Sequence, residues 1–185
     1  PIATNAGPAA ADVLRGEVVV AAGSQGTWVW DTRRWRRVPG AAPTDDATMA
    51  GLPSHGTVIA FGDYGDSSTW TWSGGGWSKA ALAPNPGVYS PSMAYDAARG
   101  AIVLFGGISD AGASPTSTWT FDGAAWTPLA TVGAPPGRSR AMMAYDQRGD
   151  RIVVFGGVER DDTWVLEGDT WRELVVATRP RARRR

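Results

Sequence analysis

Pairs of tryptophans at one fixed spacing are the feature that most constrains the fold of this 185-residue chain. Six residues separate the two members of a pair, and the pair occurs four times. The pairs are Trp28 and Trp35, Trp70 and Trp77, Trp119 and Trp126, and Trp164 and Trp171. Successive pairs are 42, 49 and 45 residues apart, and a period of about 40–50 residues with strand-like content is typical of propeller blades. The sequence therefore predicts four copies of one structural unit.

A second set of landmarks keeps the same register. An apolar run ends at a glycine pair in repeats three and four, and these pairs are Gly106 with Gly107 and Gly156 with Gly157. Repeat two has Asp63 in place of the second glycine, and repeat one has Ala22 and Gly23 at the pair. The pattern thus weakens toward the N-terminus, whereas the tryptophan spacing persists in all four repeats.

Each repeat is predicted to form four short strands. In repeat three, a first strand at residues 92–95 ends at a polar turn, and the apolar run that follows is typical of a strand buried on both faces. Residues 118–121 alternate as a third strand, and Asp122 and Gly123 form a hairpin turn before the fourth. Pro-rich segments link the repeats, and no segment has helical periodicity. The prediction is an all-β chain.

This order of apolar strand, glycine pair, aromatic residue, six residues and tryptophan resembles the kelch repeat of kelch and galactose-oxidase-type β-propellers. The resemblance covers about residues 16–174, and it implies four-stranded blades around an axis. Tryptophan occurs at the first position of each pair, where the family more often has tyrosine. The Asp-box propeller of sialidase-like proteins is an alternative because residues 72–77 are similar to it, but the full Ser-x-Asp-x-Gly-x-Thr-Trp pattern does not occur.

We expect one domain over residues 1–176, with blades at 9–38, 48–80, 90–129 and 139–174. Kelch-like propellers resemble rings of six or seven blades, so we interpret the chain as an open arc of a larger propeller. Blade one has no clear first strand, since residues 6–13 are rich in Ala, Gly and Pro. We expect terminal blades that do not touch, self-association through their exposed apolar faces, and a disordered Arg-rich tail at residues 177–185.

Composition excludes several classes of function. The chain has no cysteine, which excludes disulfides, thiolate catalysis and Cys-ligated metals. Its formal net charge is zero, so no overall field favours nucleic acid or an acidic membrane. No apolar segment approaches the roughly 20 residues of a membrane helix. The arginines of residues 179–185 could contact phosphate, but a disordered terminus is the simpler interpretation, and we expect neither nucleic acid nor a membrane span.

Metal and cofactor sites have little support in the sequence. His55 is the only histidine, and we interpret it as an exposed residue of the turn between the first two strands of repeat two. The galactose-oxidase resemblance implies a copper site with two His, two Tyr and a Cys, a set that these residues cannot supply. Asp45 with Asp46, and Asp161 with Asp162, could offer oxygens to calcium, but solvated loop charges fit better. We expect no metal and no cofactor.

The sequence gives equally little support for a catalytic site. A glycosidase needs two carboxylates across one cleft, and no such pair is evident. Sialidase chemistry would need an arginine cluster, for which Arg138, Arg140 and Arg160 are the candidates. The paired tryptophans could stack on sugar rings, but strict periodicity favours packing between blades, with Trp119 and Trp164 largely buried.

Loops on one face of the propeller remain as the candidate binding surface, because loops carried by a rigid scaffold hold function in such folds. The kelch resemblance implies contacts from the loops between second and third strands (63–68, 108–116 and 159–162) and from the segments that lead into first strands (88–90 and 137–140). The candidate binding residues are Tyr89, Ser90, Arg138, Ser139, Arg140 and Arg160.

Two functions follow from this reading. The first is a non-enzymatic interaction module within a larger bacterial protein, which binds a protein or glycan partner through its loops. The second is the non-catalytic part of a carbohydrate-active or oxidase enzyme whose catalytic residues lie in other blades. The sequence leaves the cellular compartment open, although a secreted or cell-envelope protein is favoured.

Overall fold

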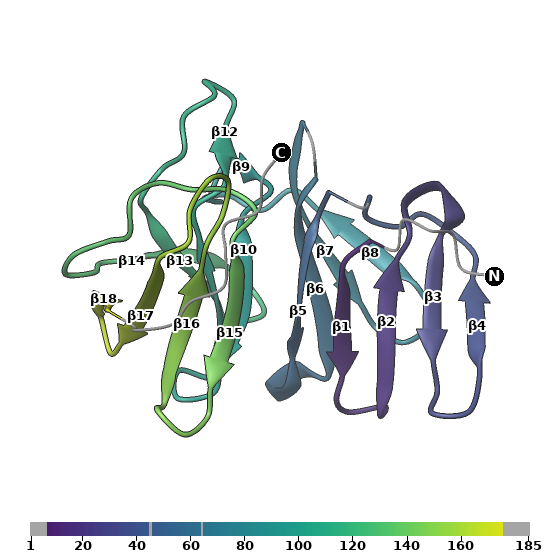
Figure 1. Cartoon of the computed structure of the whole chain (residues 1–185). Helices are drawn as coiled ribbons and strands as arrows, with labels where there is room; N and C mark the ends of the chain where they lie inside the picture. Colours follow the sequence, from purple (N-terminus) through teal and green to yellow (C-terminus); the bar gives the residue numbers. More distant parts are fainter. Residues whose placement is uncertain (1–6, 45, 64, 176–185) are drawn as a thin grey trace.

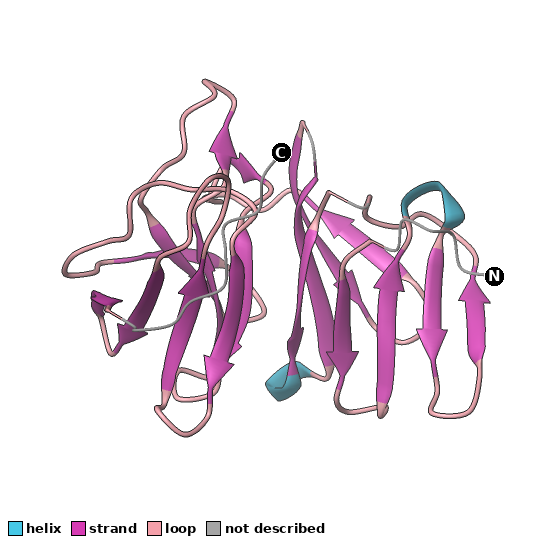
Figure 2. Cartoon of the chain, in the orientation of Figure 1, coloured by secondary structure: helices cyan, strands magenta, loops and turns pink. Residues whose placement is uncertain are grey.

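Four four-stranded antiparallel sheets form the body of the protein (Figures 1 and 2). The structure is a computed structural model, and it describes residues 7–44, 46–63 and 65–175. In each sheet the strands pair in chain order, so every sheet is a simple meander. The described helices are two short 3-10 turns, η1 (Gly23–Gln25) and η2 (Pro53–His55). The predicted all-β, propeller-type fold is confirmed.

Each sheet corresponds to one blade, and we number the blades in chain order. Blade one contains β1 (Ala9–Asp12), β2 (Glu17–Ala21), β3 (Thr27–Trp30) and β4 (Trp35–Val38). Blade two contains β5 (Thr48–Leu52), β6 (Thr57–Asp63), β7 (Asp66–Trp72) and β8 (Trp77–Ala80). Blade three contains β10 (Ser92–Asp96), β11 (Ala101–Phe105), β13 (Thr118–Phe121) and β14 (Trp126–Leu129). Blade four contains β15 (Met142–Asp146), β16 (Arg151–Phe155), β17 (Thr163–Glu167) and β18 (Thr170–Leu174).

The first strand of blade one corrects a sequence prediction. Residues 9–12 form β1 and pair antiparallel with β2 over four residues, although their Ala-rich composition gave no strand signal. Alanine has a low intrinsic preference for strands, and here β1 is held by its ladder to β2 and by packing against β5. The neighbouring first strand, β5, also needs a small residue here, because a Cβ atom on Gly51 would collide with the carbonyl oxygen of Ala11.

The first strands of the four blades lie side by side around the axis of the arc. β5 packs against β1 and β10, and β10 packs against β15. Blades one and four lie toward the viewer in Figure 1, and blades two and three lie behind them. Among the described residues, apolar cores join blades one and two, two and three, and three and four, but none joins four to one. The arc is therefore open, as predicted.

Each core is made from the same positions of two adjacent blades. One blade contributes alternate residues of its second strand, and the following blade contributes its second and third strands together with its second tryptophan. Between blades two and three the buried aromatic members are Phe61, Phe121 and Trp126. The rings of Phe61 and Trp126 lie 4.9 Å apart across this junction. The apolar runs of the sequence are thus buried between blades and not within one sheet.

The second tryptophan of each pair is the residue that crosses the junction. The indole nitrogen of Trp126 donates to the hydroxyl of Thr69 in the preceding blade at 2.8 Å, and that of Trp171 donates to Thr118 at 2.9 Å. Trp126 and Trp171 are only 1% and 3% exposed. Tryptophan supplies both a large apolar surface and a polar N–H that must be satisfied when buried, and the threonine satisfies it.

Trp119 and Trp164 were predicted to be largely buried, and neither ring is solvent-exposed in the structure. Both are half-buried and pack against the cores of their junctions. The indole nitrogen of Trp164 donates to Asp162 of its own blade at 2.8 Å. These rings therefore stay along their own sheet, whereas the second tryptophan reaches into the adjacent blade.

We predict that the second tryptophan carries most of the stability of each junction. Trp126→Ala should lower the free energy of unfolding by about 3–5 kcal/mol, because it leaves a large cavity. Trp126→Phe should cost about 1–3 kcal/mol, because it leaves the buried Thr69 hydroxyl without its donor. Urea unfolding followed by circular dichroism measures both effects, and Trp35→Ala is the matched control because Trp35 is 40% exposed. An equal loss for Trp35→Ala and Trp126→Ala would contradict the prediction.

Candidate functional site

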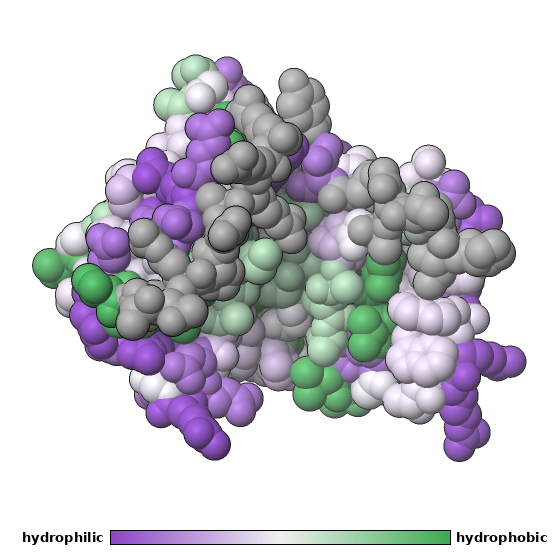
Figure 3. Space-filling model, in the orientation of Figure 1, coloured by the Kyte–Doolittle hydropathy of each residue, from purple (hydrophilic) through white to green (hydrophobic). Residues whose placement is uncertain are grey.

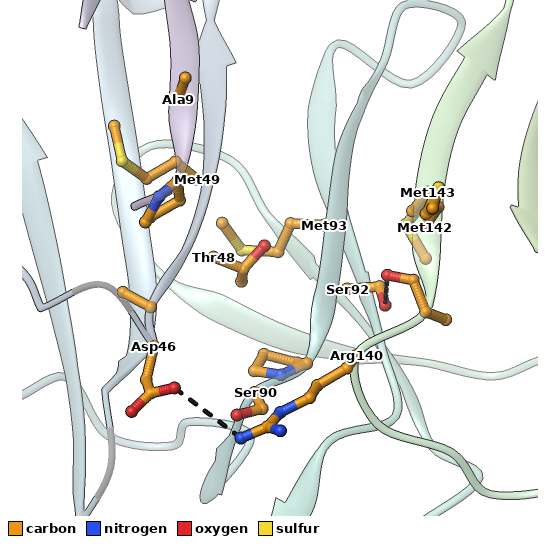
Figure 4. Close-up of a pocket in the computed structure, with 14 residues that line it drawn as sticks. Ala9, Asp46, Thr48, Met49, Ser90, Ser92, Met93, Arg140, Met142 and Met143 are labelled. Atoms are coloured by element: carbon orange, nitrogen blue, oxygen red, sulfur yellow. Dashed lines mark hydrogen bonds and ion pairs between the residues drawn. The ribbon is translucent and has the colours of Figure 1, made fainter. Parts of the chain in front are cut away.

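The inner strands are the first strands of the blades, β1, β5, β10 and β15. The segments that lead into them meet at one end of the axis, and there they surround a hollow of about 500 Å³ (Figure 4). The hollow is bordered by all four blades. Its lining residues are Pro8, Ala9, Asp46, Ala47, Thr48, Met49, Ser90, Pro91, Ser92, Met93, Arg140, Ala141, Met142 and Met143. Two of the predicted binding residues, Ser90 and Arg140, are among them.

Backbone hydrogen bonds fix the rim of this hollow. Ser90 and Arg140 each precede an inner strand by two residues, and both have left-handed backbone conformations, with φ of 50° and 54°. The amide of Ser90 donates to the carbonyl of Gly62 at 3.1 Å, and the amide of Arg140 donates to the carbonyl of Ser90 at 3.1 Å. Such a conformation costs energy in a residue other than glycine. The hydrogen bonds from blade to blade offset this cost and hold the two side chains at the rim.

Arg140 is the exposed cation of the hollow. Its side chain is 68% exposed, and its closest acid is Asp46, which is 54% exposed and lies 3.8 Å away. Figure 4 shows this ion pair spanning the opening between blades two and four. An exposed ion pair at this distance contributes little to stability. Arg140 is therefore available to exchange Asp46 for an anionic group of a ligand.

Methionine is the residue that sequence reasoning missed at this site. The chain has four methionines, and all four line the hollow. Met49, Met93 and Met143 occupy the same register, each opposite the third position of its blade's four-residue apolar run. This recurrence at the second residue of the first strand in blades two, three and four was visible in the sequence and could have identified the site. Methionine side chains are flexible and polarizable, and they suit surfaces that adapt to a partner.

Arg138 has a different position from Arg140, although only Ser139 separates them. Its side chain is 1% exposed and forms a two-point ion pair with Asp162 at 2.6 and 2.8 Å. It also donates to the carbonyls of Gly156 and Pro136 at 2.9 and 3.0 Å. Arg138 thus ties the lead-in segment of blade four to the loop between β16 and β17. Its predicted contact with a partner stays a prediction, and the hollow does not depend on it.

The close approach of this lead-in segment explains the glycine pairs that mark the repeats. Gly106 has a φ of 71°, and a Cβ atom there would collide with the carbonyl oxygen of Arg138. The amide of Gly107 donates to that same carbonyl at 2.9 Å. The glycines after the second strand therefore let the segment of the following blade approach closely.

The remaining predicted binding residues lie around the same end of the arc. Ser139 is buried, and its carbonyl accepts from the amide of Val158 at 3.2 Å. Arg160 reaches the carbonyl of Gly137 at 3.5 Å. Tyr89 belongs to β9 (Val88–Tyr89), which pairs with β12 (Ile108–Ser109) in a two-stranded sheet that the sequence did not predict. Because Arg138 faces inward and Arg140 faces the hollow, the arginine cluster that sialidase chemistry would require is not formed.

A second hollow lies where the inner strands end, at the opposite mouth of the axis. Its volume is about 360 Å³, and Tyr95 and Tyr145 are among its lining residues. The Tyr145 hydroxyl donates to Asp150, and this hydrogen bond to a carboxylate raises the pKa of Tyr145 to about 12.

The described part of the chain contains no group of three or more His, Cys, Asp or Glu residues placed to hold a metal ion. Of the proposed calcium ligands, Asp162 is held by Arg138 and Asp46 lies beside Arg140, and Asp45 lies outside the described residues. The predicted Arg-rich tail, residues 177–185, also lies outside them. His55 ends η2, where its Nδ1 lies 3.1 Å from the hydroxyl of Ser54. Across residues 7–44, 46–63 and 65–175, no helix is long and apolar enough to span a membrane.

Comparison with solved structures shows the propeller fold. The chain is similar to YjhT, with a TM-score of 0.66 and 16% sequence identity over 95% of this chain and 66% of that one. It is also similar to a fungal alcohol oxidase of the AA5 family, solved in complex with copper, with a TM-score of 0.57 and 13% identity over 96% of this chain and 54% of that one. The chain thus spans somewhat less than two thirds of YjhT and about half of the oxidase. Neither a protein family model nor a curated protein sequence matches it.

The ion pair between Arg138 and Asp162 should make the free energy of unfolding depend on pH in the acid range. The hydrogen bonds from Arg138 lower the pKa of Asp162 to about 2, below the value of about 3.9 expected in the unfolded chain. The stabilisation is therefore complete above about pH 4 and is lost as the pH falls through about 2. Asp162→Asn should cost on the order of 3 kcal/mol at pH 5, because it leaves a buried guanidinium unpaired.

Urea unfolding at a series of pH values measures this prediction. The difference in unfolding free energy between the parent chain and Asp162→Asn should shrink as the pH falls from 5 to 2.5. Glu173→Gln, which removes one carboxylate from an exposed position of β18, is the matched control. A difference that stays constant with pH would show that Asp162 does not act through its charge.

Proposed function

We propose that this chain is a non-enzymatic β-propeller module that binds a protein partner in the axial hollow bordered by Asp46, Ser90 and Arg140. The observation that carries the proposal is the hollow itself, where all four blades contribute to one recess with an exposed arginine at its rim. Rigid strands position the lining, and the lead-in segments present it, as is common for binding sites on such scaffolds. The kelch resemblance of the sequence implies partner contacts at this same end of the propeller, which supports the proposal.

The chemistry of the lining favours a peptide or protein loop over a sugar. Of the described residues that line the hollow, none has an aromatic ring on which a pyranose could stack. The lining instead combines methionines with the hydroxyls of Thr48, Ser90 and Ser92. Flexible methionines accept apolar side chains of varied shape, and Arg140 can form a two-point contact with a carboxylate. We infer that the partner presents an acidic residue flanked by apolar ones.

A library of defined acidic and apolar peptides, measured by fluorescence polarization, tests this function. Peptides that bind should lose about tenfold or more in affinity with Arg140→Ala, since a charged hydrogen bond is worth about 1.5–3 kcal/mol. Asp46→Asn should instead strengthen binding severalfold, because it removes the internal competitor for Arg140. Arg34→Ala is the matched control, because this arginine is 82% exposed in a turn of blade one.

Two outcomes would contradict the proposal. One is a set of binding peptides whose affinity is unchanged by both Arg140→Ala and Asp46→Asn. The other is binding of defined glycans, and not of peptides, with the same dependence on Arg140.

The similarity to the AA5 oxidase favours a second candidate function, namely the non-catalytic part of a larger propeller enzyme. On that proposal the copper-binding His, Tyr and Cys residues would lie in sequence that adjoins this chain in its gene. Reading that adjoining sequence tests it directly, because further repeats that carry a His, Tyr and Cys set would support the enzyme. Further repeats without that set would support the binding module.

A further inference from the structure

One hydrogen bond recurs at every junction between blades. The second tryptophan of a blade donates its indole N–H to the first threonine of the third strand in the preceding blade. The three bonds are Trp77 to Thr27 at 2.8 Å, Trp126 to Thr69 at 2.8 Å and Trp171 to Thr118 at 2.9 Å. The three threonines are each 2% exposed. The junction is therefore a specific lock with a donor on one face of the blade and an acceptor on the other.

Both halves of this lock are unused at the ends of the arc. Trp35 is the second tryptophan of blade one, and it is 40% exposed. Thr163 begins the third strand of blade four opposite Phe155, in the register that Thr118 has opposite Phe105. Among the described residues, no threonine accepts from Trp35 and no indole donates to Thr163. One end of the arc thus has a free donor, and the other end has the matching acceptor.

The apolar surfaces around Trp35 and Thr163 are exposed in the same complementary way. Val18 of blade one is 37% exposed, whereas Val58, Ile102 and Ile152 at the same position of the other blades are fully buried. On blade four, Val153 and Phe155 are half-buried, whereas the corresponding Val103 and Phe105 are fully buried. Figure 3 shows apolar side chains gathered over β1 and β2 on the face turned to the viewer. These surfaces are the two sides of a junction that is not formed within this chain.

The turns at the edge of the junction indicate which blade fits. In two internal junctions a large residue of the first turn lies over a glycine of the next blade's third turn: Arg15 over Gly74, and His55 over Gly123. In the third junction Arg99 donates to the carbonyl of Gly168 and to Asp169.

In blades four and one, the large and small residues of these turns are exchanged. Blade four has Gly149 where the other blades have Arg15, His55 and Arg99, and blade one has Thr32 where the others have Gly74, Gly123 and Gly168. Thr32 keeps the left-handed backbone of those glycines, with a φ of 74°. A small residue on blade four would therefore face a larger one on blade one. Such an exchange conserves volume, which is the change that packed interfaces tolerate best.

We propose that blade one of one copy of this chain docks on blade four of a second copy, head to tail, with the indole of Trp35 donating to the hydroxyl of Thr163. The interface continues the blade-to-blade packing already present three times in each copy. It is heterologous, because two different faces meet, so it can add copies in one direction. The occupant of both open faces is thus another molecule of the same chain.

Sedimentation velocity over a range of concentrations tests this interface, with a complementation design. Thr163→Arg blocks the acceptor face and leaves blade one intact, and Trp35→Asp blocks the donor face and leaves blade four intact. We expect the parent chain to associate as its concentration rises and each variant alone to remain a folded monomer. An equimolar mixture of the two variants should form dimers and nothing larger, because only one working junction remains.

Milder variants separate the hydrogen bond from general stickiness. Trp35→Phe keeps an aromatic ring but lacks the N–H, and it should weaken association about fivefold to tenfold, the equivalent of about 1 kcal/mol. Ser78→Arg, at an exposed position of β8 in blade two, is the control and should leave association unchanged. Circular dichroism checks that each variant is folded.

Three results would overturn the proposal. A parent chain that stays monomeric at all concentrations would leave the open faces to further blades of a longer polypeptide. Variants that still associate alone would show a different interface. A mixture that stays monomeric would show that the two faces do not meet each other.

Discussion

The bond between a buried indole and a threonine of the neighbouring blade is the interaction on which the rest of the structure depends. Isolated four-stranded meanders expose apolar side chains on both faces, so each blade is stable only when another covers it. The indole covers a large apolar area, and its single N–H requires an acceptor at a fixed place. Trp77, Trp126 and Trp171 each find one, at 2.8 to 2.9 Å. The lock therefore fixes both the distance between blades and the register in which they stack.

The candidate site is a consequence of this stacking. When the blades are held in register, the segments before β5, β10 and β15 arrive at one end of the axis. There the amide of Ser90 donates to the carbonyl of Gly62 in β6, and the amide of Arg140 donates to the carbonyl of Ser90. Arg138 forms an ion pair with Asp162 and so holds the last of these segments in place, whereas Arg140 points toward the hollow. Two arginines that are equivalent by composition thus have separate roles, one in holding the rim and one in facing a ligand.

The same logic connects the site to the open ends of the arc. A propeller stacks by repeating one junction, so a chain with unused donor and acceptor faces can continue the series with a second copy. Such an assembly would border the hollow with further blades and would change its shape, although the residues contributed by this chain would stay in place. Association and ligand binding can therefore be measured separately, through Trp35 and Thr163 for the first and Arg140 and Asp46 for the second.

The sequence by itself determined the number of blades, the position of almost every strand and the exclusion of cysteine chemistry, because strand periodicity, glycine turns and tryptophan spacing are local patterns within about 45 residues. It predicted Ser90 and Arg140 at the rim, but it missed β1, the pairing of β9 with β12, and the methionines of the hollow. Only the tertiary structure decided that Trp126 is fully buried whereas Trp119 is only partly buried, and that Arg138 faces inward whereas Arg140 faces out. These differences depend on contacts between blades, such as the one that joins Trp126 to a threonine 57 residues earlier in the chain, and no local pattern specifies which side chains meet across that separation.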